Sequence, residues 1–309
     1  MNVPTIVTHG GTESKPEESD GCESAAQSGL REMTGRGDAL AAVVKAVTVL
    51  EEDGRFNAGR GASLGMDGKT ISCDAAVVDS RGKLGAVANL LEVPHPVQVA
   101  RAVADTPHHL VVGAGALELA KRLGLHEPYG PTEKSKAEYR QQVEALRRAP
   151  AGAADGDAAD AESDAGKAMI RRLWNYPVPW GDAVNRAAHA TVGAVARDAG
   201  GTFAAAASTG GSMPALLGRV ADTPLPGCGT HAGPAGAIAC TGIGEHILKH
   251  HLAWQVYQWI DGGTRLREAM ERGMALLPEG VQVALIGITR DDTAVVSRQP
   301  MASAVAGLS

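Results

Sequence analysis

Aromatic residues and clusters of positive charge are scarce in this chain. Phe, Trp and Tyr together make up 3% of its 309 residues, and the formal net charge at pH 7 is −6. Proteins that bind nucleic acids usually carry a basic patch, often with aromatic side chains among the basic ones. The sequence has no basic stripe of this kind, so we expect no nucleic-acid partner.

Cysteines and long apolar runs are also few. The four cysteines are too far apart for a zinc pattern such as Cys-x-x-Cys, so we expect buried free thiols. No run of 18 apolar residues is present, and the N-terminal residues lack the basic and apolar regions of a secretory signal. We therefore expect a cytoplasmic protein without a membrane partner.

Small and aliphatic residues are abundant. Hydrophobic residues make up 44% of the chain, enough for one large domain or two small ones, and the 39 glycines imply elements that pack closely. Apolar periodicity and turn residues predict the elements. Strands are expected at 4–8, 72–78, 83–88, 191–197, 202–208, 236–241, 281–289 and 293–298. Helices are expected at 38–53, 96–105, 113–123, 133–148, 245–260 and 264–277. This order of elements gives an α+β or α/β fold.

Residues 150–166 differ in composition from the rest of the chain. They contain five acidic residues, no basic residue and no large apolar side chain. Such a segment cannot bury enough surface to offset the entropy lost on ordering. We expect a disordered linker within a single domain that spans 1–309.

Thr191 heads the apolar run Thr191–Arg197. A threonine at the start of a strand is ordinary, because β-branched residues suit strands. Its hydroxyl becomes an effective nucleophile only beside a base. Cleavage of the chain before Thr191 would supply one, because a free α-amine has a pKa of roughly 7.7–8.0.

Several motifs accompany Thr191 in a fixed order. They are His9-Gly10-Gly11, Asn57-Ala58-Gly59, Cys73-Asp74-Ala75-Ala76, Ser208-Thr209-Gly210-Gly211, Gly218-Arg219-Val220-Ala221-Asp222 and Cys240-Thr241-Gly242-Ile243-Gly244-Glu245. From about residue 3 to about residue 290, the chain resembles the plant-type L-asparaginase/isoaspartyl aminopeptidase family of N-terminal-nucleophile hydrolases.

The resemblance implies a four-layer αββα sandwich and self-cleavage between Ala190 and Thr191. The products would be an α chain, 1–190, and a β chain, 191–309, assembled as a dimer of αβ heterodimers. The implied reaction is hydrolysis of the side-chain amide of L-asparagine and of β-aspartyl dipeptides, which releases L-aspartate. No organic cofactor is implied.

The resemblance also assigns roles to individual residues. It makes Thr191 the nucleophile, has Thr209 orient the Thr191 hydroxyl, and has Asn57 support it. Thr241 and Gly242 would stabilise the oxyanion, a task that backbone N–H groups at a helix start can perform.

Substrate binding in the family falls to Arg219 and Asp222, with Thr241, Gly242 and Gly244 beside them. A guanidinium can hold the substrate α-carboxylate in two hydrogen bonds, and a carboxylate can accept from the α-ammonium. The simpler interpretation of Arg219 and Asp222 is a surface ion pair.

The resemblance further implies a structural sodium ion bound by main-chain carbonyls. The matching residues are Leu50, Glu51, Asp53, Phe56, Ala58 and Arg60. Backbone ligands place little constraint on side chains, so the sequence alone does not test this site.

The chain departs from the family pattern at some positions. Ala190 stands where the family has Gly or Asp, so we expect slower cleavage, and Pro214-Ala215 replace a common Asn-Lys. These departures leave open a second hypothesis, an uncleaved and catalytically degenerate relative that acts as a binding or scaffold protein. A secreted glycosylasparaginase-like enzyme is a third, which a secretory signal and disulfides would favour.

Overall fold

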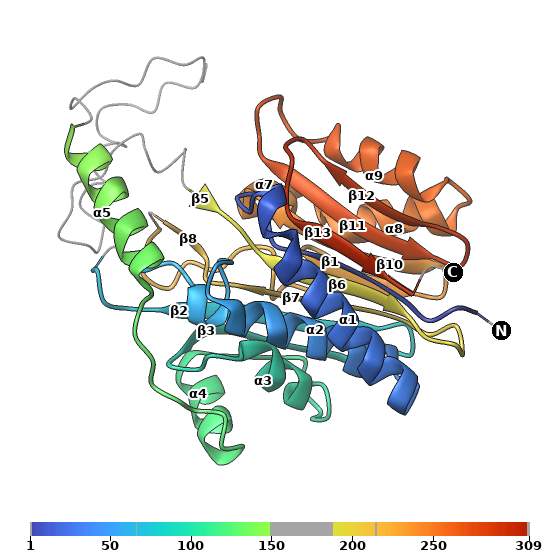
Figure 1. Ribbon diagram of the computed structural model, residues 1–309, viewed down its shortest axis with the longest axis horizontal. Coiled ribbons are helices and arrows are strands. Elements are labelled where there is room, and N and C mark those ends of the chain that lie inside the picture. Colours follow the sequence, from blue (N-terminus) through green and yellow to red (C-terminus); the bar gives the residue numbers. More distant parts are fainter. Residues whose placement is uncertain (1, 66, 149–187, 214, 308–309) are drawn as a thin grey trace.

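The computed structural model describes residues 2–65, 67–148, 188–213 and 215–307 as a mixed α/β structure (Figure 1). The expected linker at 150–166, and Pro214, lie outside the described residues. Among those that are described, none of the helices is both long and apolar enough to cross a membrane.

The larger sheet has seven strands. Their order is β13 (Ser303–Ala306), β1 (Thr5–His9), β6 (Val192–Arg197), β7 (Phe203–Thr209), β2 (Ser72–Asp79), β3 (Leu84–Leu91) and β4 (Leu110–Val112). All neighbouring strands are antiparallel except β3 and β4. β6 and β7 therefore lie in the middle of the sheet.

A second, antiparallel sheet has four strands. Their order is β12 (Thr293–Ser297), β11 (Val283–Thr289), β10 (Gly236–Gly242) and β9 (Thr230–Gly233). The short strands β5 (Ala188–His189) and β8 (Ser212–Met213) pair with each other just before Thr191.

The described helices follow the expected ranges in most places. They are α1 (Ser19–Arg36), α2 (Ala39–Asp53), α3 (Pro96–Val103), α4 (Gly113–Arg122), α5 (Glu133–Arg148), α7 (Gly244–His250), α8 (Leu252–Asp261) and α9 (Leu266–Met274), with 3-10 turns η1 (Pro16–Glu18) and η2 (Gly59–Gly61). The single helix expected at 245–260 is wrong, because His251 adopts a left-handed conformation with φ of 45° and separates α7 from α8.

The three larger clusters of buried side chains among the described residues organise the packing. One joins α1, α2, α3 and α4 to the seven-stranded sheet, and another joins α8 and α9 to the four-stranded sheet. The third lies between the sheets, where Val195 and Ala205 meet Ala239 and Ile286. Figure 1 shows α8 and α9 on the opposite side of the sheets from α3 and α4. Small side chains let the two sheets approach, which brings the end of β10 next to the start of β6.

The strands expected at 191–197 and 202–208 are confirmed as β6 and β7, which pair as a hairpin. Asp198 forms the turn, with its backbone N–H donating to the Thr202 carbonyl and its side chain accepting from the Thr202 N–H at 2.9 Å. Gly201, with φ of 83°, supplies the left-handed residue of the turn. This hairpin fixes the register of β6 and so places Thr191 at the start of a central strand.

Candidate active site

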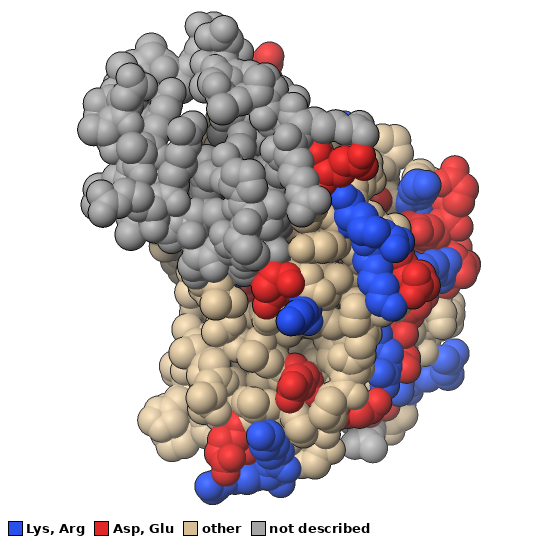
Figure 2. All heavy atoms as spheres, turned by 90° about the vertical axis from the view of Figure 1, so that its left-hand side faces the viewer, with Lys and Arg blue, Asp and Glu red and all other residues tan. Residues whose placement is uncertain are grey.

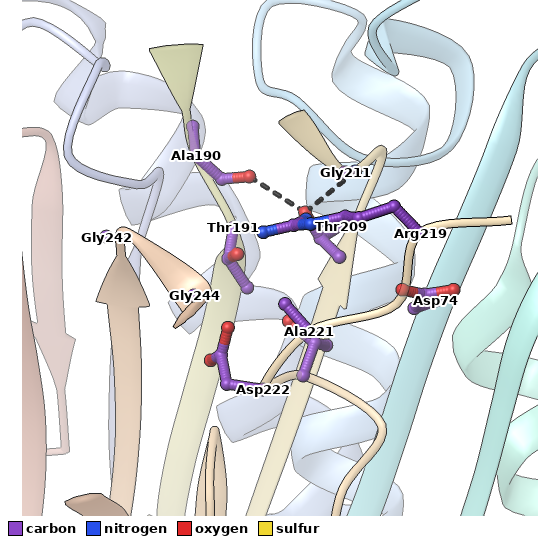
Figure 3. Close-up of a pocket in the computed structure, with 11 residues that line it drawn as sticks. Asp74, Ala190, Thr191, Thr209, Gly211, Arg219, Ala221, Asp222, Gly242 and Gly244 are labelled. Carbon is purple, nitrogen blue, oxygen red and sulfur yellow. Dashed lines mark hydrogen bonds between the residues drawn. The ribbon is translucent and has the colours of Figure 1, made fainter. Parts of the chain in front are cut away.

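Thr191 lies in a pocket at the start of β6, where it is only 5% exposed. The pocket is lined by residues from both sheets and from the loop after β8: Asp74, Ala190, Thr191, Thr209, Gly211, Arg219, Ala221, Asp222, Thr223, Gly242 and Gly244. Figure 3 shows these residues around Thr191. The cavity holds about 10 Å³, room for about one water molecule. An amino-acid substrate therefore does not fit while Ala190 stays in place.

The carbonyl of Ala190 accepts two side-chain hydrogen bonds. Asn57 Nδ2 donates to it at 3.1 Å and Thr209 Oγ1 at 2.9 Å; the second bond is drawn in Figure 3. The sequence predicts that Thr209 orients the Thr191 hydroxyl, but in the uncut chain the Thr209 hydroxyl donates to the carbonyl before it. Two donors on one carbonyl are an arrangement that stabilises an oxyanion.

The Asn57 amide is held from several sides. Its Nδ2 also donates to the Gly211 carbonyl at 2.7 Å, and its Oδ1 accepts from the Ser63 N–H at 2.9 Å. The Asn57 backbone carbonyl accepts from the Gly210 N–H at 2.9 Å. The donor is therefore fixed before any reaction begins.

Thr241 and Gly242 reach the site from the other sheet. The Thr241 Oγ1 accepts from the Thr191 backbone N–H at 3.2 Å, so in the uncut chain it contacts the nitrogen that cleavage would free. Gly242 has φ of 140°, and a Cβ atom there would lie 2.3 Å from the Gln282 carbonyl oxygen. Only glycine lets the end of β10 lie so close to the backbone of Gln282.

Gly11 is a site residue that belongs to a quoted motif but had no role assigned to it. Its φ is 98°, and a Cβ atom on it would lie 2.9 Å from the Ala190 Cβ and 3.0 Å from the Thr191 nitrogen. The His9-Gly10-Gly11 motif was the available signal, since glycine at such a position permits close backbone approach.

Arg219 makes a two-bond ion pair, but its partner is Glu245 rather than Asp222. Its Nε and Nη2 donate to the two Glu245 oxygens, each at 2.9 Å. Gly244 lies against both proposed binding residues, because a Cβ atom there would be 2.5 Å from Asp222 Oδ1 and 3.1 Å from Arg219 Nη2. The structure thus brings Arg219, Asp222 and Gly244 together beside Thr191.

Two buried carboxyl groups flank Arg219. Burial raises the pKa of Asp222 to about 7, although the Arg219 charge opposes the shift. One of its oxygens, Oδ2, has no hydrogen-bond partner within the described part of the chain. This group can accept a cation that enters the pocket, since an opposite charge restores its ionised form.

Asp74 is the second of these groups, and no role was predicted for it. The pairing of β2 with β3 is irregular between Cys73 and Ala75, and Asn89, with φ of 50°, donates its N–H to Asp74 Oδ1 at 2.7 Å. Burial raises the pKa of Asp74 to about 6. Bulges often redirect a side chain next to active sites, and this one turns Asp74 into the pocket wall.

The residues expected to bind sodium lie at the end of α2 and in the loop through η2. Carbonyl oxygens crowd the two glycines of η2. A Cβ atom at Gly59 would lie 2.8 Å from the Glu51 oxygen, and one at Gly61 would lie 2.1 Å from the Phe56 oxygen. Within the described ranges no cluster of three His, Cys, Asp or Glu side chains could hold a metal. The donor set that remains is main-chain carbonyl oxygen, which suits a hard cation.

The side chains in this loop are engaged elsewhere. Asp53 pairs with Arg55 at 2.6 Å, and Arg60 pairs with Glu52 at 2.7 Å. Glu51 is fully buried, and its Oε1 caps α3 by accepting from the Val97 N–H at 3.0 Å. These contacts fix the loop from which Asn57 reaches the Ala190 carbonyl.

Charged side chains on the outer surface are mixed in sign. On the face shown in Figure 2, the described Lys and Arg residues alternate with Asp and Glu.

Known proteins match the chain over nearly its whole length. The family model described as "Asparaginase" matches residues 2–297. A plant-type L-asparaginase of Pyrococcus furiosus is 36% identical over 298 residues, which cover 93% of this chain and 90% of that protein. An isoaspartyl peptidase/L-asparaginase of Danio rerio is 34% identical over 287 residues, 90% of this chain and 83% of that protein. The resemblance drawn from the motifs is confirmed, and the chain belongs to the asparaginase family.

Proposed function

We propose that this protein is an amidohydrolase that cuts itself between Ala190 and Thr191 and then uses Thr191 as its nucleophile. The observation that carries the proposal is the arrangement at that peptide bond. Asn57 and Thr209 donate to its carbonyl, and Thr241 accepts from its N–H.

The self-cleavage step follows from these contacts. The Thr191 Oγ attacks the Ala190 carbonyl carbon, and negative charge develops on the oxygen that Asn57 and Thr209 hold. The C–N bond breaks, the hydroxyl proton passes to the departing nitrogen, and an ester joins Ala190 to Thr191. Water hydrolyses the ester, which leaves a carboxylate on Ala190 and a free α-amine on Thr191.

Turnover takes place in the part of the pocket that Ala190 vacates after cleavage. The Thr191 Oγ attacks the side-chain carbonyl of the substrate while the α-amine takes its proton and passes it to the leaving amine. Thr241 and Gly242 stabilise the oxyanion in this half of the cycle. Water then opens the acyl-enzyme and releases aspartate.

Arg219 and Asp222 select the substrate. Arg219 binds the α-carboxylate and Asp222 accepts from the α-ammonium, so the side-chain carbonyl points to Thr191. The names of the relatives from Pyrococcus furiosus and Danio rerio support L-asparagine and β-aspartyl peptides as the substrate class.

The larger assembly is part of the same proposal. The two facing sheets with helices on their outer sides form the four-layer αββα sandwich of N-terminal-nucleophile hydrolases. Cleavage gives α (1–190) and β (191–309) chains that assemble as a dimer of αβ units. A sodium ion would be held by the main-chain carbonyls of Leu50, Glu51, Asp53, Phe56, Ala58 and Arg60, and it would keep the Asn57 loop in position.

The proposed binding of the substrate α-carboxylate by Arg219 and of its α-ammonium by Asp222, here called the clamp, is tested by four substrates and one variant. The enzyme should release amino acids from L-asparagine and β-Asp-Leu, but not from α-Asp-Leu or N-acetyl-β-Asp-Leu, because each of the latter lacks one charged group. Arg219→Lys keeps the charge but loses the planar guanidinium that can donate two parallel hydrogen bonds, so kcat/KM should fall at least about tenfold. Comparable turnover of all four compounds, or unchanged kinetics in a cleaved Arg219→Lys enzyme, would show that the clamp does not exist.

A further inference from the structure

A second and larger pocket lies beside the one that contains Thr191. It holds about 440 Å³, a volume in the range of small-molecule sites, whereas the pocket around Thr191 holds about 10 Å³. The described residues on its wall come from the loop after β1, from α5, from β8 and from the chain near residues 282 and 299–300. None of these residues has a role in the proposed catalytic steps.

The walls of the two pockets are continuous with each other. Gly211 lines the pocket around Thr191, and Met213, two residues further along the chain, lines the larger pocket. Gly242 also belongs to the first wall and Gln282 to the second. A Cβ atom on Gly242 would lie 2.3 Å from the Gln282 carbonyl oxygen. The larger pocket therefore adjoins the catalytic one.

The leaving group of the proposed reaction extends toward the larger pocket. The Thr191 nitrogen passes a proton to the leaving amine, so the two nitrogens must lie next to each other. A Cβ atom on Gly11 would lie 3.0 Å from the Thr191 nitrogen, and Thr12, the next residue, lines the larger pocket. Arg219 and Asp222, which hold the opposite end of the substrate, line only the pocket around Thr191.

Lys15 is the only basic residue among the described residues on the wall of the larger pocket. It follows a turn in which the Ser14 N–H donates to the Gly11 carbonyl at 3.1 Å, and this turn keeps Lys15 at the wall. Its side chain is exposed, and within the part of the chain that the structure describes its ammonium makes no ion pair. Glu13 and Glu138 also line the pocket, so a carboxylate that enters it is attracted by Lys15 alone.

We propose that the larger pocket binds the leaving residue of a β-aspartyl dipeptide, and that Lys15 binds the free α-carboxylate of that residue. This inference rests on the proposed function. L-Asparagine releases only ammonia, which is too small to reach Lys15. Lys15 is therefore a specificity-determining residue that favours dipeptides and does not affect L-asparagine.

The proposal predicts a change in KM that depends on the substrate. Lys15→Gln keeps a polar side chain but removes the positive charge, so KM for β-Asp-Leu should rise about threefold to tenfold, as for a partly exposed ion pair. KM for L-asparagine should stay the same. KM for β-Asp-Leu amide should also stay the same, because its leaving residue ends in a neutral group.

The matched control is Lys45→Gln. Lys45 is an exposed residue of α2 that lines neither pocket, so this variant removes a comparable charge elsewhere. Its KM values for all three compounds should equal those of the parent enzyme. The proposal is overturned if KM for β-Asp-Leu does not rise in Lys15→Gln, or if KM for L-asparagine rises equally.

Calorimetric titration separates this inference from the reaction itself. If the parent protein hydrolyses neither L-asparagine nor β-Asp-Leu, the proposed function fails, and titration of the same protein with β-Asp-Leu decides the role of Lys15. Weaker binding to Lys15→Gln than to the parent would still support that role. Equal affinity of the two proteins, or no binding to the parent, would refute it.

Discussion

Three threonines share the site, and each hydroxyl or amide has a different partner. Thr191 contributes the bond to be broken, Thr209 donates to the carbonyl of Ala190, and Thr241 accepts from the N–H of Thr191. A sequence can indicate which threonines belong to the site. It cannot indicate which hydrogen bonds they donate or accept, because these depend on how the two sheets are positioned against each other.

Thr209→Val should slow self-cleavage about 10²- to 10³-fold, the usual cost of removing one oxyanion donor. The shape of the side chain is kept, but the 2.9 Å bond to Ala190 is lost. Thr209→Ser retains the hydroxyl and serves as the control. The measurement is the fraction of cut chain on a denaturing gel over time. Cleavage of the valine variant at the parent rate would show that Thr209 takes no part in self-cleavage.

Asp222→Asn should stabilise the uncut protein at alkaline pH. Because the folded-state pKa of Asp222 is about 7, above the ordinary value of 3.8, the folded chain holds a proton that the unfolded chain releases between about pH 4 and pH 7. Stability therefore falls as pH rises through that window. In a Thr191→Ala background, Asp222→Asn should raise the Tm by a few degrees at pH 8, with a free-energy gain on the order of 2 kcal/mol.

The pH dependence supplies the check on that result. The gain should shrink at pH 5, where the Asp222 carboxyl is already protonated in the folded protein. Equal gains at both pH values would mean that the buried charge is not their source.

The residues that the sequence missed have a common physical origin. Gly11, Asp74 and Glu245 stand within the quoted motifs but were given no role, because each makes its contact through the tertiary fold. The contacts are a turn against Ala190, a bulge in β2, and a side chain that reaches Arg219. By contrast, Arg219 and Asp222 were predicted together because both stand in the Gly218-Arg219-Val220-Ala221-Asp222 motif, to which the family resemblance assigns substrate binding.

At the scale of elements, regular patterns predicted well and small-residue patterns did not. The hairpin of β6 and β7 carries an Asp-Ala-Gly-Gly turn and was predicted within one residue. Helix α1 was missed because Cys22, Ala25 and Ala26 provide its buried face instead of large aliphatic residues. Gly29 on the same helix lets Ile6 and α2 approach, so close packing there depends on small side chains.

The loop through η2 gives an element-scale prediction. Gly61→Ala would place a Cβ atom 2.1 Å from the Phe56 oxygen, so the carbonyls must move. If these carbonyls hold sodium, the parent protein should have a higher Tm in sodium chloride than in choline chloride. Gly61→Ala should abolish this difference. Gly35→Ala is the control, because no atom lies within 4 Å of its Cβ position. A Tm of the parent protein that is the same in both salts would contradict the sodium site.

At the scale of the whole molecule, the proposed cut divides the chain but not the core. β1, from the α chain, lies between β13 and β6, both from the β chain. The main buried cluster also combines Ile6 and Val43 with Val192 and Ala302. The two chains should therefore stay associated after cleavage, since the same buried surface holds them together.

The central claim is that Thr191 becomes an N-terminal residue, and intact-mass spectrometry of the natively purified protein tests it most directly. After incubation, the protein should give two co-purifying chains, 1–190 and 191–309, the second beginning with Thr191, while Thr191→Ala stays uncut. A single chain of 31.7 kDa that persists in the parent protein would contradict the account and favour an uncleaved binding protein.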